Sequence, residues 1–100
     1  MQERIFEYIK NKKGQRIGML VGMVCNSQIV FGFSQVNLKS GDKFDRNIGM
    51  TMAVNRALGV QDSPTYTTEV YPMLAPFANR CVKYFQQATS LSLVGGYTGI

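Results

Sequence analysis

Residues 16–36, RIGMLVGMVCNSQIVFGFSQV, decide the fold of this chain. The two halves of this stretch are rich in β-branched and aromatic residues, which favour strands. Asn26-Ser27 lies between them and suits a two-residue hairpin turn. Such a turn would pair Val24 with Ile29, Gly22 with Phe31, Leu20 with Phe33 and Gly18 with Gln35. The stretch therefore predicts an antiparallel hairpin in which the ring of Phe31 lies across Gly22.

Both faces of this predicted hairpin are apolar. One face carries Leu20, Val24, Ile29, Phe31 and Phe33. The other face carries Ile17, Met19, Val21, Met23, Cys25, Val30 and Val36. A sheet that is apolar on both sides needs two covers. We expect the helices that follow to provide one cover and a partner subunit to provide the other, so the chain should form a homo-oligomer.

The elements around the hairpin complete an α+β domain. Residues 3–10, ERIFEYIK, predict a strand, and Lys13-Gly14 predicts the turn after it. A first helix is indicated over 42–58, with Ser40 or Asp42 as its N-cap and Gly59 as its stop. It contains a line of small residues on which another helix could pack closely, namely Gly49, Ala53 and Ala57.

A second helix is predicted from Leu74 onward. Its apolar positions share one face: Leu74, Phe77, Ala78, Cys81, Phe85 and Ala88. In the tail, Leu91 and Leu93 alternate with serines, as in a short C-terminal strand. We therefore expect residues 1–100 to form a single domain, with a three-stranded antiparallel meander sheet followed by two packed helices.

The composition narrows the function classes. The 100 residues carry a net charge of +5, no histidine and two cysteines, Cys25 and Cys81, which we expect to be buried thiols. Without histidine, a serine or cysteine nucleophile lacks its usual base, and a zinc site made by protein side chains lacks ligands. We therefore expect that the protein is not an enzyme and that it binds neither a metal ion nor a cofactor. The sequence has no signal peptide and no apolar run long enough to cross a bilayer, which indicates a cytoplasmic protein without a membrane partner.

The residues that we expect to bind a ligand begin in residues 40–59, SGDKFDRNIGMTMAVNRALG. Ser40 opens a segment that leads into a helix N-terminus, where free N–H groups favour anions. Lys43 and Arg46 could flank a phosphate, and Arg56 could join them from the far end of the helix or from another subunit. Phe44 could stack on a base. The alternative is that the cations are ordinary surface charges.

A further pair lies on the second predicted helix. Arg80 and Tyr84 are one helical turn apart on its exposed face, where they could stack on a base and hold a phosphate. The predicted ligand-binding set is Ser40, Lys43, Phe44, Arg46, Arg56, Arg80 and Tyr84.

One part of the chain resembles a known family. Its residues are Gly32-Phe33-Ser34, Asp42-Lys43-Phe44-Asp45, Gly49, Ala53 and Arg56-Ala57. This order of strand end, polar loop and helix, after three strands and before another helix, resembles the Thoeris anti-defence sponge proteins of phages. The resemblance implies an oligomer in an infected bacterial host that sequesters, without cleaving it, a cyclic ADP-ribose-type or cyclic oligonucleotide signal. It transfers none of the family's ligand residues.

Two other functions stay open. A basic phage module could bind nucleic acid or inhibit a host protein, with a salt dependence set by counterion release in the first case. A self-assembling structural protein would need no ligand site. The expectation that we carry forward is a small anionic, nucleotide-derived ligand bound by a non-enzymatic homo-oligomer.

Overall fold

The computed structural model describes residues 3–85 of the chain. Three strands, β1 (Arg4–Lys10), β2 (Arg16–Cys25) and β3 (Gln28–Gln35), form an antiparallel sheet in the order β1-β2-β3. Two helices follow, α1 (Arg46–Ala57) and α2 (Leu74–Tyr84), each preceded by a short 3-10 turn, η1 (Leu38–Ser40) and η2 (Tyr71–Met73). The predicted α+β fold, a three-stranded meander followed by two helices, is confirmed. The predicted C-terminal strand and Ala88 lie outside the described residues.

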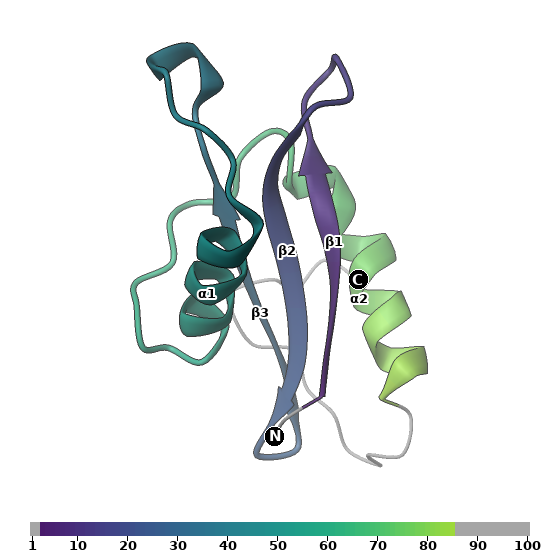
Figure 1. The fold of residues 1–100 in the computed structure, drawn as a ribbon. Coiled ribbons are helices and arrows are strands. Elements are labelled where there is room, and N and C mark those ends of the chain that lie inside the picture. The colour runs from purple at the N-terminus through teal and green to yellow at the C-terminus, as the bar shows by residue number, and fades with distance from the viewer. Residues whose placement is uncertain (1–2, 86–100) are drawn as a thin grey trace.

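The two helices lie on opposite faces of the sheet (Figure 1). α2 contributes to a core cluster with sheet residues such as Leu20 and Phe31. α1 contributes Ala53 and Ala57 to a second cluster with Val21 and Met23. Both apolar faces therefore have a cover within one chain. The two-faced sheet does not require a partner subunit, and this sequence-based argument for an oligomer was wrong.

The β2–β3 hairpin has the predicted register. Gly22 pairs with Phe31, and the three other predicted pairs are present as well. Asn26 and Ser27 adopt positive φ angles of 52° and 64°, as a type I′ turn requires. Gly22 is also where α2 approaches the sheet, because a Cβ there would collide with the Cys81 sulfur.

Two residues of the predicted hairpin, Ile17 and Val36, lie on the other face from that predicted. Val36 follows the end of β3 at Gln35, where the alternation of the strand stops, and it packs against the α2-face cluster. The β1–β2 pairing passes from Ile9–Gly18 to Lys10–Arg16 and skips Ile17. An unpaired extra residue of this kind reverses the alternation of side chains on its strand. Ile17 is therefore buried in the α2-face cluster and not beside Met19 on the α1 face.

Helix α1 begins later than predicted, at Arg46. Its N-cap is Asp45, whose carboxylate accepts a hydrogen bond of 3.0 Å from the Ile48 N–H. Ser40 instead ends η1, and Asp42 accepts from the Asn37 N–H at 3.3 Å, so both predicted caps were wrong. The end of α1 is as predicted. Gly59 has a φ of 77° and its N–H donates to the Arg56 carbonyl.

The small residues of α1 pack on the sheet, not on another helix. Gly49, Ala53 and Ala57 are its buried positions. Opposite them, a Cβ at Gly32 would collide with the Ala53 carbonyl oxygen. The Ser34 hydroxyl donates a buried hydrogen bond of 2.8 Å to the Gly49 carbonyl. The helix backbone therefore lies unusually close to β3, and the expected helix partner is replaced by this strand.

Helix α2 has the buried face that the sequence predicts. Leu74, Phe77, Ala78 and Cys81 are buried, and Phe85 just beyond the helix is 2% exposed. Phe31 of the sheet and Phe77 of the helix place their ring centroids 5.9 Å apart. Asn79, Arg80 and Lys83 are exposed on the opposite side. The larger part of the core thus lies between α2 and the sheet.

Candidate functional site

A row of aromatic rings lies on the α1 face of the sheet, along β1. Helix α1 packs on β3 and β2 and leaves the β1 side of this face beside it (Figure 1). Phe6 and Tyr8 alternate with buried Ile5 and Ile9, so their rings lie on the α1 face. The Phe6 and Tyr8 ring centroids are 5.6 Å apart, and those of Tyr8 and Phe44 are 6.1 Å apart. We call Phe6, Tyr8 and Phe44 the aromatic row.

Two arginines lie over the aromatic row. The Arg16 guanidinium carbon is 3.9 Å from the Tyr8 ring centroid, and that of Arg46 is 5.7 Å from the Phe6 centroid. Both distances are within the range of a cation–π interaction. Arg16 and Arg46 are exposed, whereas the three rings are half-buried. The aromatic row with these two arginines is called the arginine–aromatic surface below.

The local structure explains how these side chains meet. Skipping Ile17 in the pairing places Arg16 opposite Lys10, on the same face as Tyr8. The Asp45 cap starts α1 at Arg46, so this guanidinium extends from the first turn of the helix toward Phe6. Phe44 precedes the cap and packs beside Tyr8. Three separate segments therefore build one surface.

The cations of this surface are not neutralised by carboxylates. Within residues 3–85, the single ion pair at 4.0 Å or less joins Arg80 to Glu7, on the α2 face. Arg16 and Arg46 thus carry charges available to an anion in solvent. The planar guanidinium also offers a second flat face on which a base can stack.

Next to Phe44, a cavity of about 240 Å³ lies between the end of β3 and the start of α1. Lys43 and Phe44 line it, but so do Asp42 and Asp45. The Asp45 carboxylate already accepts the Ile48 N–H, which occupies part of the positive end of the helix. Ser40 is not among the residues that line the cavity. The predicted phosphate position at this helix N-terminus therefore gains no support from the geometry.

A larger cavity, of about 440 Å³, lies at the end of the sheet where Ile17 and Gln35 meet the loop before α2. Gln35 donates to the Glu69 carboxylate at 3.0 Å and accepts from the Thr67 hydroxyl at 2.7 Å. The Gln35 hydrogen bond lowers the pKa of Glu69, which keeps this carboxylate ionised. Lys39 also lines this cavity, so its wall carries one positive and one negative charge and has no excess of positive charge for an anionic ligand.

Arg56 lies apart from the arginine–aromatic surface, at the outer edge of β3. Its Nη1 donates to the Phe33 carbonyl at 3.0 Å. The side chain is half-buried, and its Nε has no hydrogen-bond partner. The structure therefore gives Arg56 a contact that fixes α1 to the edge strand.

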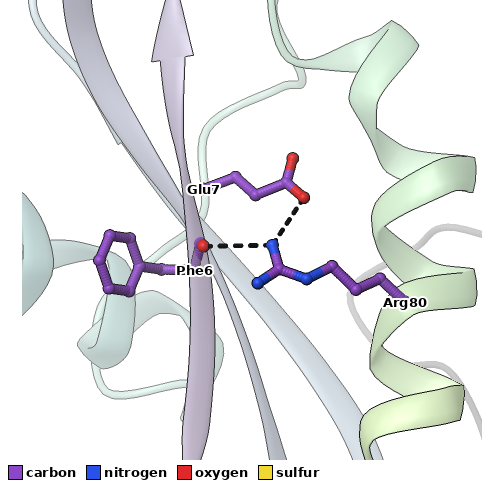
Figure 2. Close-up of polar contacts among 3 residues, drawn as sticks. All are labelled: Phe6, Glu7 and Arg80. Carbon is purple, nitrogen blue, oxygen red and sulfur yellow. Dashed lines mark hydrogen bonds and ion pairs between the residues drawn. The ribbon is translucent and has the colours of Figure 1, made fainter.

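Arg80 lies on the α2 face and reaches the outer edge of β1 (Figure 2). Its Nη1 donates to the Glu7 carboxylate at 2.7 Å and to the Phe6 carbonyl at 3.5 Å. Figure 2 also shows the Phe6 ring on the side of β1 away from Arg80. Tyr84 packs edge-on against Phe85, with centroids 4.9 Å apart. Arg80 and Tyr84 are thus separated by the sheet from Phe44 and Arg46.

The predicted ligand-binding set is therefore divided by the fold. Phe44 and Arg46 meet in the arginine–aromatic surface, with Lys43 next to Phe44 in the chain. Ser40, Arg56 and the Arg80–Tyr84 pair lie elsewhere. Sequence reasoning missed Phe6, Tyr8 and Arg16. The first two could have been found, because Arg4, Phe6, Tyr8 and Lys10 alternate along one face of the predicted first strand.

Comparison of the chain with protein-family models, curated proteins and solved structures found no match. The resemblance to the sponge proteins therefore stays a prediction. Among the described residues, no helix is long and apolar enough to cross a membrane. Residues 3–85 also contain no cluster of three or more cysteine, aspartate or glutamate side chains placed to hold a metal ion.

Proposed function

We propose that this chain binds nucleotide-derived ligands, without transforming them, on the arginine–aromatic surface. The observation that carries the proposal is the placement of two unpaired guanidinium groups directly over an aromatic row. Nucleotides combine a flat base with a negative phosphate. A surface that offers flat rings and free cations side by side is complementary to both parts.

Each group has a definite role in this proposal. A base stacks on an exposed part of the aromatic row or on the outer face of the Arg16 guanidinium. Arg46 extends from the first turn of α1 and pairs with a phosphate. The Phe6 and Tyr8 rings are held edge-to-face at an interplanar angle of 88°, so they form a preorganised support. Binding of this kind needs no nucleophile.

Nucleotide binding on this surface would suit the sponge function that the resemblance to the Thoeris anti-defence proteins implies. A phage anti-defence protein would remove a nucleotide signal from solution by holding it. Complete enclosure of a small signal would need more than the surface of one chain, because the neighbouring cavity of about 240 Å³ is smaller than usual ligand pockets of roughly 300–1,000 Å³. A homo-oligomer therefore stays part of the sponge prediction.

The test is a titration of the full chain with AMP, a cyclic dinucleotide and a single-stranded hexanucleotide, followed by backbone amide NMR. We expect at least one ligand to bind and to shift amides of β1 and of residues 43–47. Arg46→Gln should weaken that binding, and the matched control Lys83→Gln should not. Both variants remove one exposed cation, but Lys83 lies on α2, beyond the sheet. Absence of binding by all three ligands would overturn the proposal.

A further inference from the structure

We propose that the ligand of the arginine–aromatic surface is single-stranded nucleic acid, bound along β1. This inference rests on the proposed function and narrows its ligand class. We base this inference on three features of the surface: the length of the aromatic row, the number of cations around it, and the need of stacking for unpaired bases.

The aromatic row is extended. Its rings follow one another at 5.6 Å and 6.1 Å between centroids. Alternate residues of a strand are about 6.6 Å apart, a step that an extended, unstacked nucleotide can span. A strand of nucleic acid running along β1 could therefore place one base at Phe6 and the next on the outer face of the Arg16 guanidinium, which lies over Tyr8. A mononucleotide would use only one of these positions.

The cations extend beyond the rings. Arg4 and Lys10 flank Phe6 and Tyr8 on the same strand, and alternation places them on the α1 face. Lys43 is next to Phe44 in the chain. Together with Arg16 and Arg46 this makes five exposed cations, none of them in an ion pair within residues 3–85. A polyanion engages several of these charges at once and gains from the release of its counterions.

The aromatic row also discriminates against a duplex. Bases stack on protein rings through their flat faces, and those faces are covered in a double helix. The half-buried rings can reach only bases that are already unpaired. Direct stacking thus requires a single strand, whereas a purely electrostatic surface would accept a duplex as well.

The experiment measures the affinity of the full chain for AMP and for labelled single strands of three, six and nine nucleotides. We expect affinity to rise from AMP to the hexanucleotide and to exceed that for a nine-base-pair duplex. Log Kobs should fall linearly with log salt, and each phosphate contact contributes a slope of about −0.7 for single strands. Arg46→Gln should remove about one such contact, and Lys83→Gln should leave the slope unchanged.

Ring variants separate stacking from charge. Tyr8→Leu should weaken hexanucleotide binding about 5- to 150-fold, since base–aromatic stacking contributes roughly 1–3 kcal/mol per base. Tyr8→Phe keeps the ring and should bind like the unchanged chain. Circular dichroism identifies any variant that fails to fold, and Phe6→Leu then provides the second test of the same row.

The outcomes of these binding experiments test the single-strand inference and the proposed function separately. Equal affinity for AMP and for all oligonucleotides overturns the single-strand inference but leaves the proposed function intact. Equal affinity for duplex and single strand overturns the inference as well. Binding of none of these ligands overturns the inference, and it overturns the proposed function as well if the cyclic dinucleotide also fails to bind. Binding that neither Arg46→Gln nor the ring variants weaken overturns both.

Discussion

The two faces of the sheet are built from different side chains. On the α2 face, bulky residues such as Leu74 and Phe77 fill the space between helix and sheet. On the α1 face, small residues let the helix backbone come close to β3, as Gly32 and Ala53 show. Because α1 sits close over β3 and β2, the outer strand β1 is left to aromatic side chains and arginines. The α2 face thus contributes most of the apolar burial, and the α1 face presents the arginine–aromatic surface.

Truncating one aromatic ring on each face should give the largest difference in stability between the two faces. Phe77→Ala should lower the free energy of unfolding by about 3–5 kcal/mol, because it leaves a cavity in the α2-face core. Phe44→Ala should cost about 1 kcal/mol, the average for a point substitution, because its ring is half-buried.

Urea denaturation measures both changes. Phe77→Leu provides a milder truncation if Phe77→Ala does not fold. Equal losses at Phe77 and Phe44 would show that the two faces contribute alike, contrary to the comparison.

The second prediction concerns the close approach of α1 to β3. Gly32→Ala places a methyl group against the Ala53 carbonyl and the Ala57 amide, which are backbone atoms that cannot rotate away. Overpacking of this kind costs roughly 1–3 kcal/mol, so the melting temperature should fall. Gln61→Ala is a suitable control, because Gln61 is an exposed residue of the loop after α1. An unchanged melting temperature for Gly32→Ala would mean that α1 lies farther from the sheet.

The cysteines report on the two faces through their reactivity. Cys81 lies on the sheet-facing side of α2 and is completely buried, and burial raises the pKa of its thiol to about 12. The reactive thiolate is therefore scarce at pH 8. Cys25 is only half-buried on the α1 face, so the prediction of two buried thiols was wrong for this cysteine. We expect a thiol reagent at pH 8 to modify Cys25 in the folded protein and Cys81 only after unfolding.

The raised pKa of Cys81 also makes the stability of the fold depend on pH. Below about pH 9 the Cys81 thiol is protonated in the folded and the unfolded chain. Between pH 9 and about 12 only the unfolded chain ionises this group, so rising pH favours unfolding. The stability advantage of the unchanged chain over Cys81→Ala should therefore shrink from pH 9 upward in urea titrations. An advantage that grows with pH would contradict the burial of this thiol.

The smallest effect is expected at the outer edge of β1. Glu7 and Arg80 form an ion pair of 2.7 Å, but their side chains are 38% and 50% exposed. Exposed pairs contribute about 0.2–1 kcal/mol and are weakened by salt. A double-mutant cycle with Glu7→Gln and Arg80→Gln should give a coupling in this range. A coupling that persists unchanged in 1 M salt would indicate a buried contact.

Parts of this fold follow directly from local sequence. The pair Asn26-Ser27 fixes the hairpin register through its turn, and Gly59 ends α1 because it adopts positive φ. The buried face of α2 follows from the spacing of Leu74, Phe77 and Cys81. These features depend on residues close in the chain, so periodicity and turn chemistry are sufficient.

Other parts depend on contacts between distant residues. The skipped pairing at Ile17, the placement of each helix on its own face and the approach of Arg16 to Tyr8 are set by how the elements pack. Arg80 could be recognised as exposed, but not as the partner of Glu7, 73 positions away. The candidate site was therefore only partly predictable: Phe44 and Arg46 belong to the favoured stretch, whereas Phe6, Tyr8 and Arg16 come from elements that were read only for their strand pattern.

The most direct test of the account is amide NMR mapping of a bound single-stranded hexanucleotide on the full chain. We predict that the largest shifts lie in β1, at Arg16 and over residues 43–47, and that α2 changes little. Shifts concentrated in α2, around Arg80 and Tyr84, would contradict it, because the ligand would then lie on the face that we assign to stability.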